Sequence, residues 1–255
     1  MLLELRGVSR RFGGLLAVSD LSMTIGAGTI HGLIGPNGAG KSTAFNLITG
    51  VIPLTAGEVL FKRERISGLR PSEICRRGIA RTFQATALFR EYTVLQNVLI
   101  GAHLVAARGL GPALFWSRGY RERERRARER GRALLSSLGL GAVAGHVAGQ
   151  LPHRDQKALA LAMALATGAE LVILDEPLAG LTDQEKTETT NVLRRLKEQG
   201  VTVLLVEHDM KAVMGVCDTV TVLDHGVRIA EGTPREIQAN PAVIEAYLGA
   251  EEPGA

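Results

Sequence analysis

Largely apolar runs are the clearest pattern along this chain. Three of them stand out, at Thr29–Ile34, Leu171–Leu174 and Val201–Val206. Runs of this kind predict strands that are buried on both faces of a parallel sheet. Helix-compatible stretches lie between them, as the crossovers between parallel strands require. The pattern therefore predicts an α/β fold.

Two other regions predict antiparallel pairing. Near the N-terminus, short apolar-bearing segments separated by glycine turns predict strands at Leu2–Arg6, Leu21–Ile25 and Glu58–Lys62. Near the C-terminus, Asp224-His225-Gly226 predicts a hairpin between Thr219–Leu223 and Val227–Ala230. A short helix is expected to begin at Pro234, and the last residues, 251–255, are expected to be frayed.

The pattern of apolar residues changes from strand-like runs to helical spacing between Thr93 and Leu138. Val94, Leu95, Val98 and Leu99 recur at helical spacing, and an arginine-rich helical stretch follows. This predicts a helical subdomain inserted into the α/β core. We expect one domain over 1–255, with the core at about 1–92 and 159–232, the helical subdomain at about 93–158 and a helical tail at about 233–255.

Charge is concentrated in one stretch. The chain has 255 residues, 45% of them hydrophobic, and a net charge of +4. Arg118–Arg132 contains eight arginines and three glutamates, so it carries +5 and the remainder carries −1. Such a stretch could face nucleic acid or anionic lipid. The alternative is a solvated helix, in which Glu122–Arg126 and Glu124–Arg128 form favourable i,i+4 pairs.

Several classes of protein are disfavoured. Cys75 and Cys217 are far apart, so no disulfide framework or zinc site follows. Glu4 and Arg6 interrupt the first apolar residues, which argues against a signal peptide. No run of 18 apolar residues exists, so we expect the chain to work at a membrane only by docking to another protein.

One motif points directly to phosphate chemistry. The match to G-x-x-x-x-G-K-[ST] is complete and comprises Gly35, Pro36, Asn37, Gly38, Ala39, Gly40, Lys41, Ser42 and Thr43. A predicted strand precedes it and a helix-compatible stretch follows. Glycines let backbone N–H groups turn toward an anion, Lys41 is expected to reach the β- and γ-phosphates, and Ser42 to ligate Mg²⁺. The alternative is an ordinary glycine-rich turn.

Two predicted strand ends add candidate catalytic groups. Asp175 and Glu176 follow the run at 171–174, at the edge where α/β sheets place ligands. Asp175 is expected to help hold Mg²⁺, and Glu176 to orient and deprotonate an attacking water. His208 follows the run at 201–206 and could contact the γ-phosphate. The alternatives are solvated or backbone-bonded side chains at strand ends.

Two further residues carry weaker signals. Gln84 precedes the helical insertion, and its amide could contact Mg²⁺ or the attacking water. Phe12 lies in Arg10-Arg11-Phe12-Gly13-Gly14 and could stack on a nucleotide base. An aromatic residue near the N-terminus is more often part of the core, so that alternative stays open.

Taken in order, these motifs resemble the ATP-binding cassette of ABC transporters over almost the whole chain. The resemblance implies a P-loop NTPase (RecA-like) α/β core with an N-terminal antiparallel β-subdomain and an inserted α-helical subdomain. It also implies ATP and Mg²⁺ as ligands, a head-to-tail dimer with a second cassette subunit, and docking to permease subunits near Ala85–Leu95. It assigns the aromatic-loop role to Phe12, the Q-loop to Gln84, the D-loop to Ala179–Asp183 and the switch role to His208.

Finer features resemble the importers of branched-chain amino acids. They are Ala179-Gly180-Leu181, Glu207-His208-Asp209-Met210, the segment Ile229–Pro234 and the ending Tyr247-Leu248-Gly249. Urea importers and lipopolysaccharide exporters share parts of this pattern. The resemblance implies a peripheral location at the cytoplasmic face of the membrane, an indirect link to a substrate-binding protein, and no nucleic-acid partner.

The signature region departs from the family. The resemblance implies L-S-x-G, where a serine hydroxyl and a glycine backbone grip the γ-phosphate on the opposite subunit. This chain has Leu151, Pro152, His153, Arg154, Asp155 and Gln156. Pro152 offers neither hydroxyl nor N–H, and Arg154 is bulky where close backbone approach is implied. We therefore expect an asymmetric heterodimer with one degenerate site, although a homodimer stays open.

Three other functions remain as alternatives. A soluble cassette ATPase acting on nucleic acid or ribosomes is favoured only by Arg118–Arg132. A subunit that binds nucleotide without turnover is suggested by Pro152 and Arg154, whereas Glu176 argues against it. A small-molecule kinase would share the phosphate loop but has no need for Asp175, Glu176 and His208 in this order.

Overall fold

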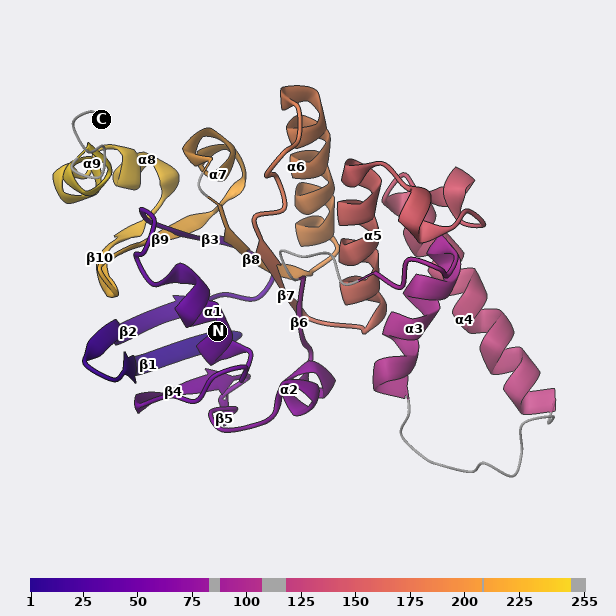
Figure 1. Ribbon diagram of the computed structural model, residues 1–255, viewed down its shortest axis with the longest axis horizontal. Helices are drawn as coiled ribbons and strands as arrows, with labels where there is room; N and C mark the ends of the chain where they lie inside the picture. The colour runs from indigo at the N-terminus through magenta and orange to yellow at the C-terminus, as the bar shows by residue number, and fades with distance from the viewer. Residues whose placement is uncertain (83–87, 107–117, 208, 249–255) are drawn as a thin grey trace. The chain divides into compact units, whose positions relative to one another are not determined.

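The computed structural model describes residues 1–82, 88–106, 118–207 and 209–248 (Figure 1). The chain divides into two compact units, one formed by Met1–Ile74 with Glu170–Ala255 and the other by Cys75–Ala169. The second unit is thus an insertion in the sequence of the first. The finer division, with a helical subdomain over 93–158, stays a prediction.

An antiparallel sheet occupies the N-terminal part of the first unit. Its strand order is β2-β1-β4-β5, with bounds Leu3–Phe12 (β1), Leu15–Ile25 (β2), Ala56–Phe61 (β4) and Glu64–Arg65 (β5). All three predicted antiparallel strands are present, but β1 and β2 continue into a hairpin that closes at Gly13-Gly14. Register shifts along this pair interrupt the alternation of side chains. Bulges of this kind erase the period-two pattern by which a strand is recognised.

The main sheet carries the largely apolar runs. Its strands in the first unit follow the order β10-β9-β3-β8-β7, with bounds Ile30–Ile34 (β3), Leu171–Asp175 (β7), Thr202–Val206 (β8), Thr219–Asp224 (β9) and Val227–Gly232 (β10). Strands β7, β8, β3 and β9 are parallel, and every residue of β3 and β8 is buried. Burial on both faces explains why these strands were recognisable as continuous runs.

The C-terminal hairpin forms as predicted. β9 and β10 pair with Asp224 opposite Val227, and the two turn residues His225 and Gly226 both have positive φ. This is the geometry that two-residue hairpin turns favour. The predicted short helix is α8, which begins at Pro234. A capping box between Thr233 and Glu236 stabilises its N-terminus.

The remaining helices of the first unit connect and flank these strands. Their bounds are Lys41–Ile48 (α1), Asp183–Glu198 (α6), Met210–Val216 (α7), Pro234–Gln238 (α8) and Pro241–Leu248 (α9). Figure 1 shows α8 and α9 beside the β9–β10 hairpin, with which both helices are in contact. Helix α2, Pro71–Arg77, crosses the boundary between the two units in the sequence.

The second unit is mainly helical. It contains Ile79–Arg81 (β6), Val94–Ala106 (α3), Arg118–Ser137 (α4), Gly141–Val143 (η2), Ala148–Gln150 (η3) and His153–Ala166 (α5). Helices α3 and α5 pack so closely at Gly101 that a Cβ there would lie 2.6 Å from the carbonyl oxygen of Met163. In the part of the chain that the structure describes, no helix has both the length and the apolar character needed to cross a bilayer.

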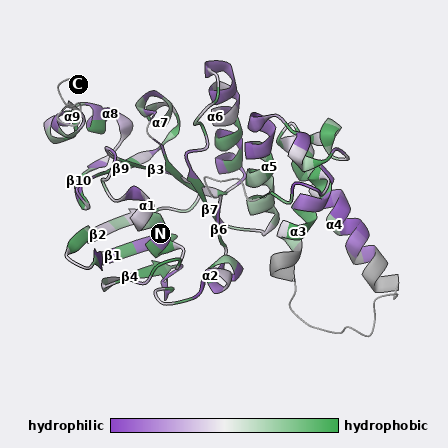
Figure 2. Cartoon of the chain, in the orientation of Figure 1, coloured by the Kyte–Doolittle hydropathy of each residue, from purple (hydrophilic) through white to green (hydrophobic). Residues whose placement is uncertain are grey.

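Helix α4 is the arginine-rich stretch, and Figure 2 shows it largely in hydrophilic colour. Both predicted pairs form, with Arg126 at 2.8 Å from Glu122 and Arg128 at 2.7 Å from Glu124. Arg125 adds two more ion pairs on the same helix. The pairs lie on an exposed surface, so they neutralise charge locally and contribute little to stability.

Candidate functional site

Three strand ends meet at one edge of the main sheet. In the parallel register, Val206 of β8 pairs with Leu33 of β3 on one side and with Asp175 of β7 on the other. The residues that leave these strands are therefore level with one another to within a residue. The phosphate loop follows β3, the acidic pair closes β7, and Glu207 follows β8. The sheet thus assembles segments that are far apart in the sequence.

The phosphate loop, residues 35–40, leaves no room for a Cβ at two of its glycines. Gly35 and Gly40 have φ of 150° and 96°. A Cβ on Gly35 would lie 2.1 Å from the carbonyl oxygen of Leu223, and one on Gly40 would lie 2.6 Å from that of Ala17. Neighbouring strands therefore fix the loop from behind. On its open side, Asn37, Gly38 and Ser42 are exposed to solvent.

Lys41 begins α1 and lies across the loop. Its ammonium group donates hydrogen bonds to the carbonyl oxygens of Gly35 and Pro36, at 2.7 and 2.8 Å. Burial lowers the pKa of Lys41, and the negative charges of Glu176 and Asp175 partly oppose that shift. The first turn of α1 contains no acidic residue, so the positive end of the helix dipole is not offset there.

The acidic pair lies where the sequence predicts it. Asp175 is the last residue of β7, and Glu176 follows in the left-handed region with φ of 49°. Both side chains are half-buried. The backbone N–H of Glu176 donates to the carbonyl oxygen of Val206 at 2.9 Å. A non-glycine residue in this conformation costs about 1 kcal/mol or more, and such strain often accompanies a functional position.

The loop and the acidic pair fit a polyphosphate with Mg²⁺. Gly35 and Gly40 let the loop lie directly against the strands behind it, and Lys41 supplies a cation across the loop. Ser42 and Asp175 offer oxygen ligands of the kind that Mg²⁺ prefers. Among the described residues there is no group of three or more His, Cys, Asp or Glu able to hold a metal ion.

Of the remaining predicted site residues, the structure describes Phe12 but not Gln84 or His208. Phe12 is not a core residue: it is 43% exposed, and the Arg10 guanidinium lies 4.5 Å from its ring centroid. Its contact with a base stays a prediction. Gln84 and His208 lie outside the described residues, as do positions 85–87 of the predicted docking segment. Within that segment, Phe89 and Tyr92 are exposed and form an edge-to-face pair.

The signature region begins helix α5. Leu151 is buried, whereas Pro152, His153 and Arg154 are exposed. Pro152 is the N-cap residue, and its side chain offers no capping hydrogen bond. Gln156 turns back and donates to the carbonyl oxygen of Leu151 at 2.8 Å. The helix therefore presents basic side chains, rather than a hydroxyl group, at its first turn.

Within the predicted D-loop, Thr182 has a local structural role. Thr182 is the N-cap of α6, its hydroxyl accepts from the N–H of Glu185, and the Glu185 carboxylate accepts from the N–H of Thr182. Threonine thus satisfies the helix N-terminus as an aspartate or asparagine would.

Two buried polar residues were missed from the sequence. Glu207 is 1% exposed and accepts a hydrogen bond from the backbone N–H of Leu178 at 2.6 Å. Asn97 is fully buried, and its amide bonds to the N–H and the carbonyl oxygen of Phe89 and to the carbonyl oxygen of Thr93. The available signal for Glu207 was its place directly after a buried strand, as for Glu176.

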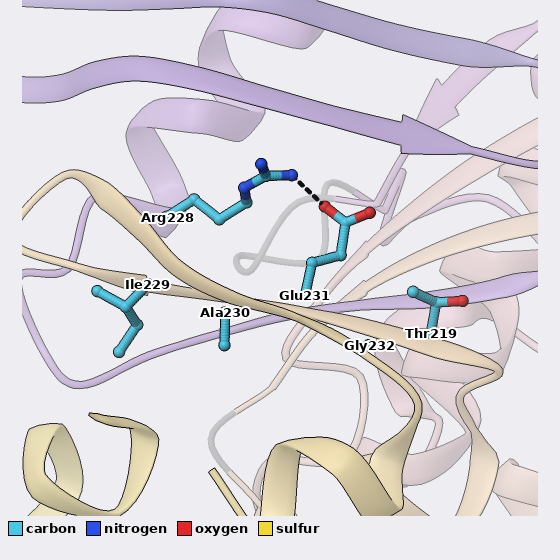
Figure 3. A pocket seen from close by; sticks show the side chains of 6 residues that line it. All are labelled: Thr219, Arg228, Ile229, Ala230, Glu231 and Gly232. Atoms are coloured by element: carbon cyan, nitrogen blue, oxygen red, sulfur yellow. Dashed lines mark hydrogen bonds and ion pairs between the residues drawn. The ribbon is translucent and has the colours of Figure 1, made fainter. Parts of the chain in front are cut away.

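A separate pocket lies along β10, with a volume of about 470 Å³. Figure 3 shows its lining residues, Thr219 and Arg228–Gly232, with Arg228 paired to Glu231 at 2.6 Å. None of the predicted site residues lines it. Because its two charged side chains neutralise each other, the pocket has no excess positive charge for a polyphosphate, and we assign it no ligand.

Comparison with known proteins identifies the family. The family model for "ABC transporter" matches residues 18–179, and that for "Branched-chain amino acid ATP-binding cassette transporter" matches residues 227–253. The chain is 41% identical to the high-affinity branched-chain amino acid transport ATP-binding protein LivG of Escherichia coli K12, covering 97% of this chain and 98% of LivG. It is 40% identical to BraF of Pseudomonas aeruginosa, with coverage of 97% and 98%.

A solved structure gives the same result. The chain is similar to the ADP conformation of MJ1267, an ATP-binding cassette of an ABC transporter, with a TM-score of 0.85 and 31% identity. That likeness covers 97% of this chain and 98% of the other. Together with the loop geometry and the order of motifs, these likenesses confirm the resemblance and the predicted fold class. The chain belongs to the ATP-binding cassettes of the ABC transporter family.

Proposed function

We propose that this chain is the Mg²⁺-dependent ATPase subunit that energises an importer of branched-chain or related amino acids. The main support for ATPase activity is the arrangement at one edge of the main sheet. There, the pairing of β3 and β7 with β8 brings the phosphate loop level with Asp175 and Glu176. The substrate class is supported by the 41% identity with LivG and by the match of residues 227–253.

Each predicted site residue has a distinct role in binding or hydrolysing ATP. The phosphate-loop amides and Lys41 bind the β- and γ-phosphates of ATP, and Phe12 stacks on the base. Ser42, Asp175 and Gln84 hold Mg²⁺, which neutralises charge on the phosphates when bound. Glu176 orients the attacking water and accepts its proton, and His208 contacts the γ-phosphate. Hydrolysis of this kind depends on positioning and electrostatic stabilisation more than on covalent chemistry.

The partners follow from the same assignment. A second cassette subunit completes the ATP sites, and permease subunits dock near Ala85–Leu95, where the exposed Phe89 and Tyr92 offer an apolar contact. The chain is thereby held at the cytoplasmic face of the membrane. A substrate-binding protein acts on the permease rather than on this chain.

The altered signature region makes this pairing asymmetric. This chain's phosphate loop, paired with an intact signature of the partner, forms the hydrolysing site. The partner's ATP meets Pro152, His153 and Arg154, and that site turns over slowly. Fast, cooperative hydrolysis by this chain without a second cassette would contradict the asymmetry.

Binding of ATP tests the site itself. Titration calorimetry with Mg²⁺ and ATP should show at least about tenfold weaker binding in Lys41→Ala than in the wild type, because one charge-assisted contact to phosphate is lost. Lys62→Ala is a matched control: Lys62 is an exposed lysine in the turn between β4 and β5, and it pairs with Glu170. Equal affinities for all three proteins would contradict the assigned site.

Uptake tests the transport function. Cells that lack this chain should regain uptake of radiolabelled leucine when the wild type is supplied, but not when Glu176→Gln is supplied. Restored uptake of urea without leucine would favour the urea importer instead. Leucine uptake that does not depend on this chain would overturn the proposed substrate class.

A further inference from the structure

Glu207 is a buried carboxylate that the functions assigned above leave unexplained. It directly follows β8, is 1% exposed, and accepts a 2.6 Å hydrogen bond from the N–H of Leu178. Leu178 is two residues beyond Glu176 in the sequence. Burial of a carboxylate is unfavourable unless hydrogen bonds and charge compensate for it, and an apolar side chain would pack there at lower cost. The carboxylate therefore points to a role other than filling space.

A second acid anchors the same stretch of chain. Asp209 is the N-cap of α7, where one carboxylate oxygen accepts from the N–H of Ala212 at 3.1 Å. Its other oxygen accepts from the ammonium group of Lys186, on α6, at 2.6 Å. The hydrogen bond to Asp209 raises the pKa of Lys186, and the charges of Asp209, Asp183 and Glu207 act in the same direction while burial opposes it.

These contacts join two segments on both sides of position 208. Three contacts make this connection: Glu176 N–H to the Val206 carbonyl oxygen, Leu178 N–H to the Glu207 carboxylate, and the Lys186 ammonium group to the Asp209 carboxylate. The first tie is a backbone contact that any sequence could form. The other two require these particular side chains. The contact of Glu207 with Leu178 holds the chain directly beyond the strained backbone of Glu176, and the contact of Asp209 with Lys186 joins the start of α7 to α6.

We propose that Glu207 is a positioning residue for ATP hydrolysis: its carboxylate fixes the loop behind Glu176 against the end of β8, and so sets where the Glu176 carboxylate lies. The proposal rests on the proposed function, because it assumes that Glu176 acts on the attacking water. Glu207 itself does not contact the substrate. A loss of this tie should impair the hydrolysis step more than the binding of ATP, since the phosphate loop is held by β9 and β2 instead.

The test uses the full chain in the transporter complex purified through a tag on this chain. Glu207→Ala should lower kcat by about tenfold or more, because small displacements of a catalytic group are costly. The KM for ATP should stay within about twofold of the wild type. Glu207→Gln keeps an oxygen acceptor for Leu178 and should restore kcat to within about threefold of the wild type. Amide hydrogen exchange at Leu178 should accelerate in Glu207→Ala and not in Glu207→Gln.

Asp218 provides a matched control at the opposite edge of the same sheet. It accepts a 2.9 Å hydrogen bond from the N–H of Ile30 and forms an ion pair with Lys197, so it too combines a backbone contact with a lysine. Asp218→Ala should reduce stability while kcat per folded molecule stays within about twofold of the wild type. This separates a general loss of stability from an effect on the site.

The outcomes distinguish the two proposals. Turnover that is lost in Glu176→Gln but unchanged in Glu207→Ala would overturn the positioning role and leave the proposed function intact. Parallel losses of kcat and ATP affinity in Glu207→Ala would also overturn it, as would a kcat in Glu207→Gln as low as in Glu207→Ala. A wild-type complex without ATP turnover would overturn both proposals.

Discussion

Replacing His31 by glutamine should make the stability of this chain less sensitive to acid. His31 lies in β3, is 2% exposed, and its Nε2 is hydrogen-bonded to the Thr221 hydroxyl at 2.8 Å. Burial lowers the pKa of His31 to about 4, and the charge of Glu231 opposes that shift only in part. The imidazole is therefore neutral in the folded protein at physiological pH.

The size of the effect follows from proton linkage. In the unfolded chain His31 takes up a proton near its ordinary pKa of 6.5, whereas the folded protein stays neutral until about pH 4. Below pH 6.5 the unfolded state thus binds the extra proton, and the free energy of unfolding falls as the pH falls. The full loss is about 3 kcal/mol, of which about 2 kcal/mol occurs between pH 7 and pH 5.

Urea unfolding of the nucleotide-free chain at pH 7, 6 and 5, followed by circular dichroism, measures this loss. Between pH 7 and 5, the wild type should lose about 2 kcal/mol more than His31→Gln, which cannot titrate in this range. Leu15→Ala serves as the control, because it replaces an exposed side chain that carries no titratable group, and its pH slope should match the wild type. Equal slopes for the wild type and His31→Gln would refute the reasoning.

Three further changes test individual contacts by urea unfolding at pH 7. Gly35→Ala should cost about 3 kcal/mol or more, because its Cβ would collide with the Leu223 carbonyl oxygen; a cost below 1 kcal/mol would contradict the loop geometry. Thr182→Ala should cost about 1 kcal/mol through the lost cap of α6, and an unchanged midpoint would argue against the capping box. The buried Tyr247 hydroxyl lies beside the Gly35 backbone but makes no hydrogen bond of normal geometry within the described residues. Tyr247→Phe should therefore be neutral or stabilising by up to about 1 kcal/mol, and a clear destabilisation would indicate a hidden partner.

The glycine loop between β3 and α1 could be predicted from the sequence, because the motif itself contains residues that tolerate positive φ. Gly35 and Gly40 are required by their own backbone angles, and Lys41 is placed by the start of the helix that the loop leads into. The parallel strands were equally predictable, since burial on both faces leaves a run of apolar residues that needs no knowledge of its neighbours. In the same way, Asp224-His225-Gly226 contains the turn geometry of its hairpin.

The features that only the tertiary structure decided depend on residues distant in the sequence. The length of β1 and β2 was hidden because bulges against a partner strand break the alternation. In the sequence, Glu207 is indistinguishable from any polar residue that follows a strand. Its burial and its bond to Leu178, 29 residues away, exist only because the sheet places β8 beside β7. Desolvation and pairing of a charge are properties of its surroundings, and a sequence specifies those surroundings only once the chain has folded.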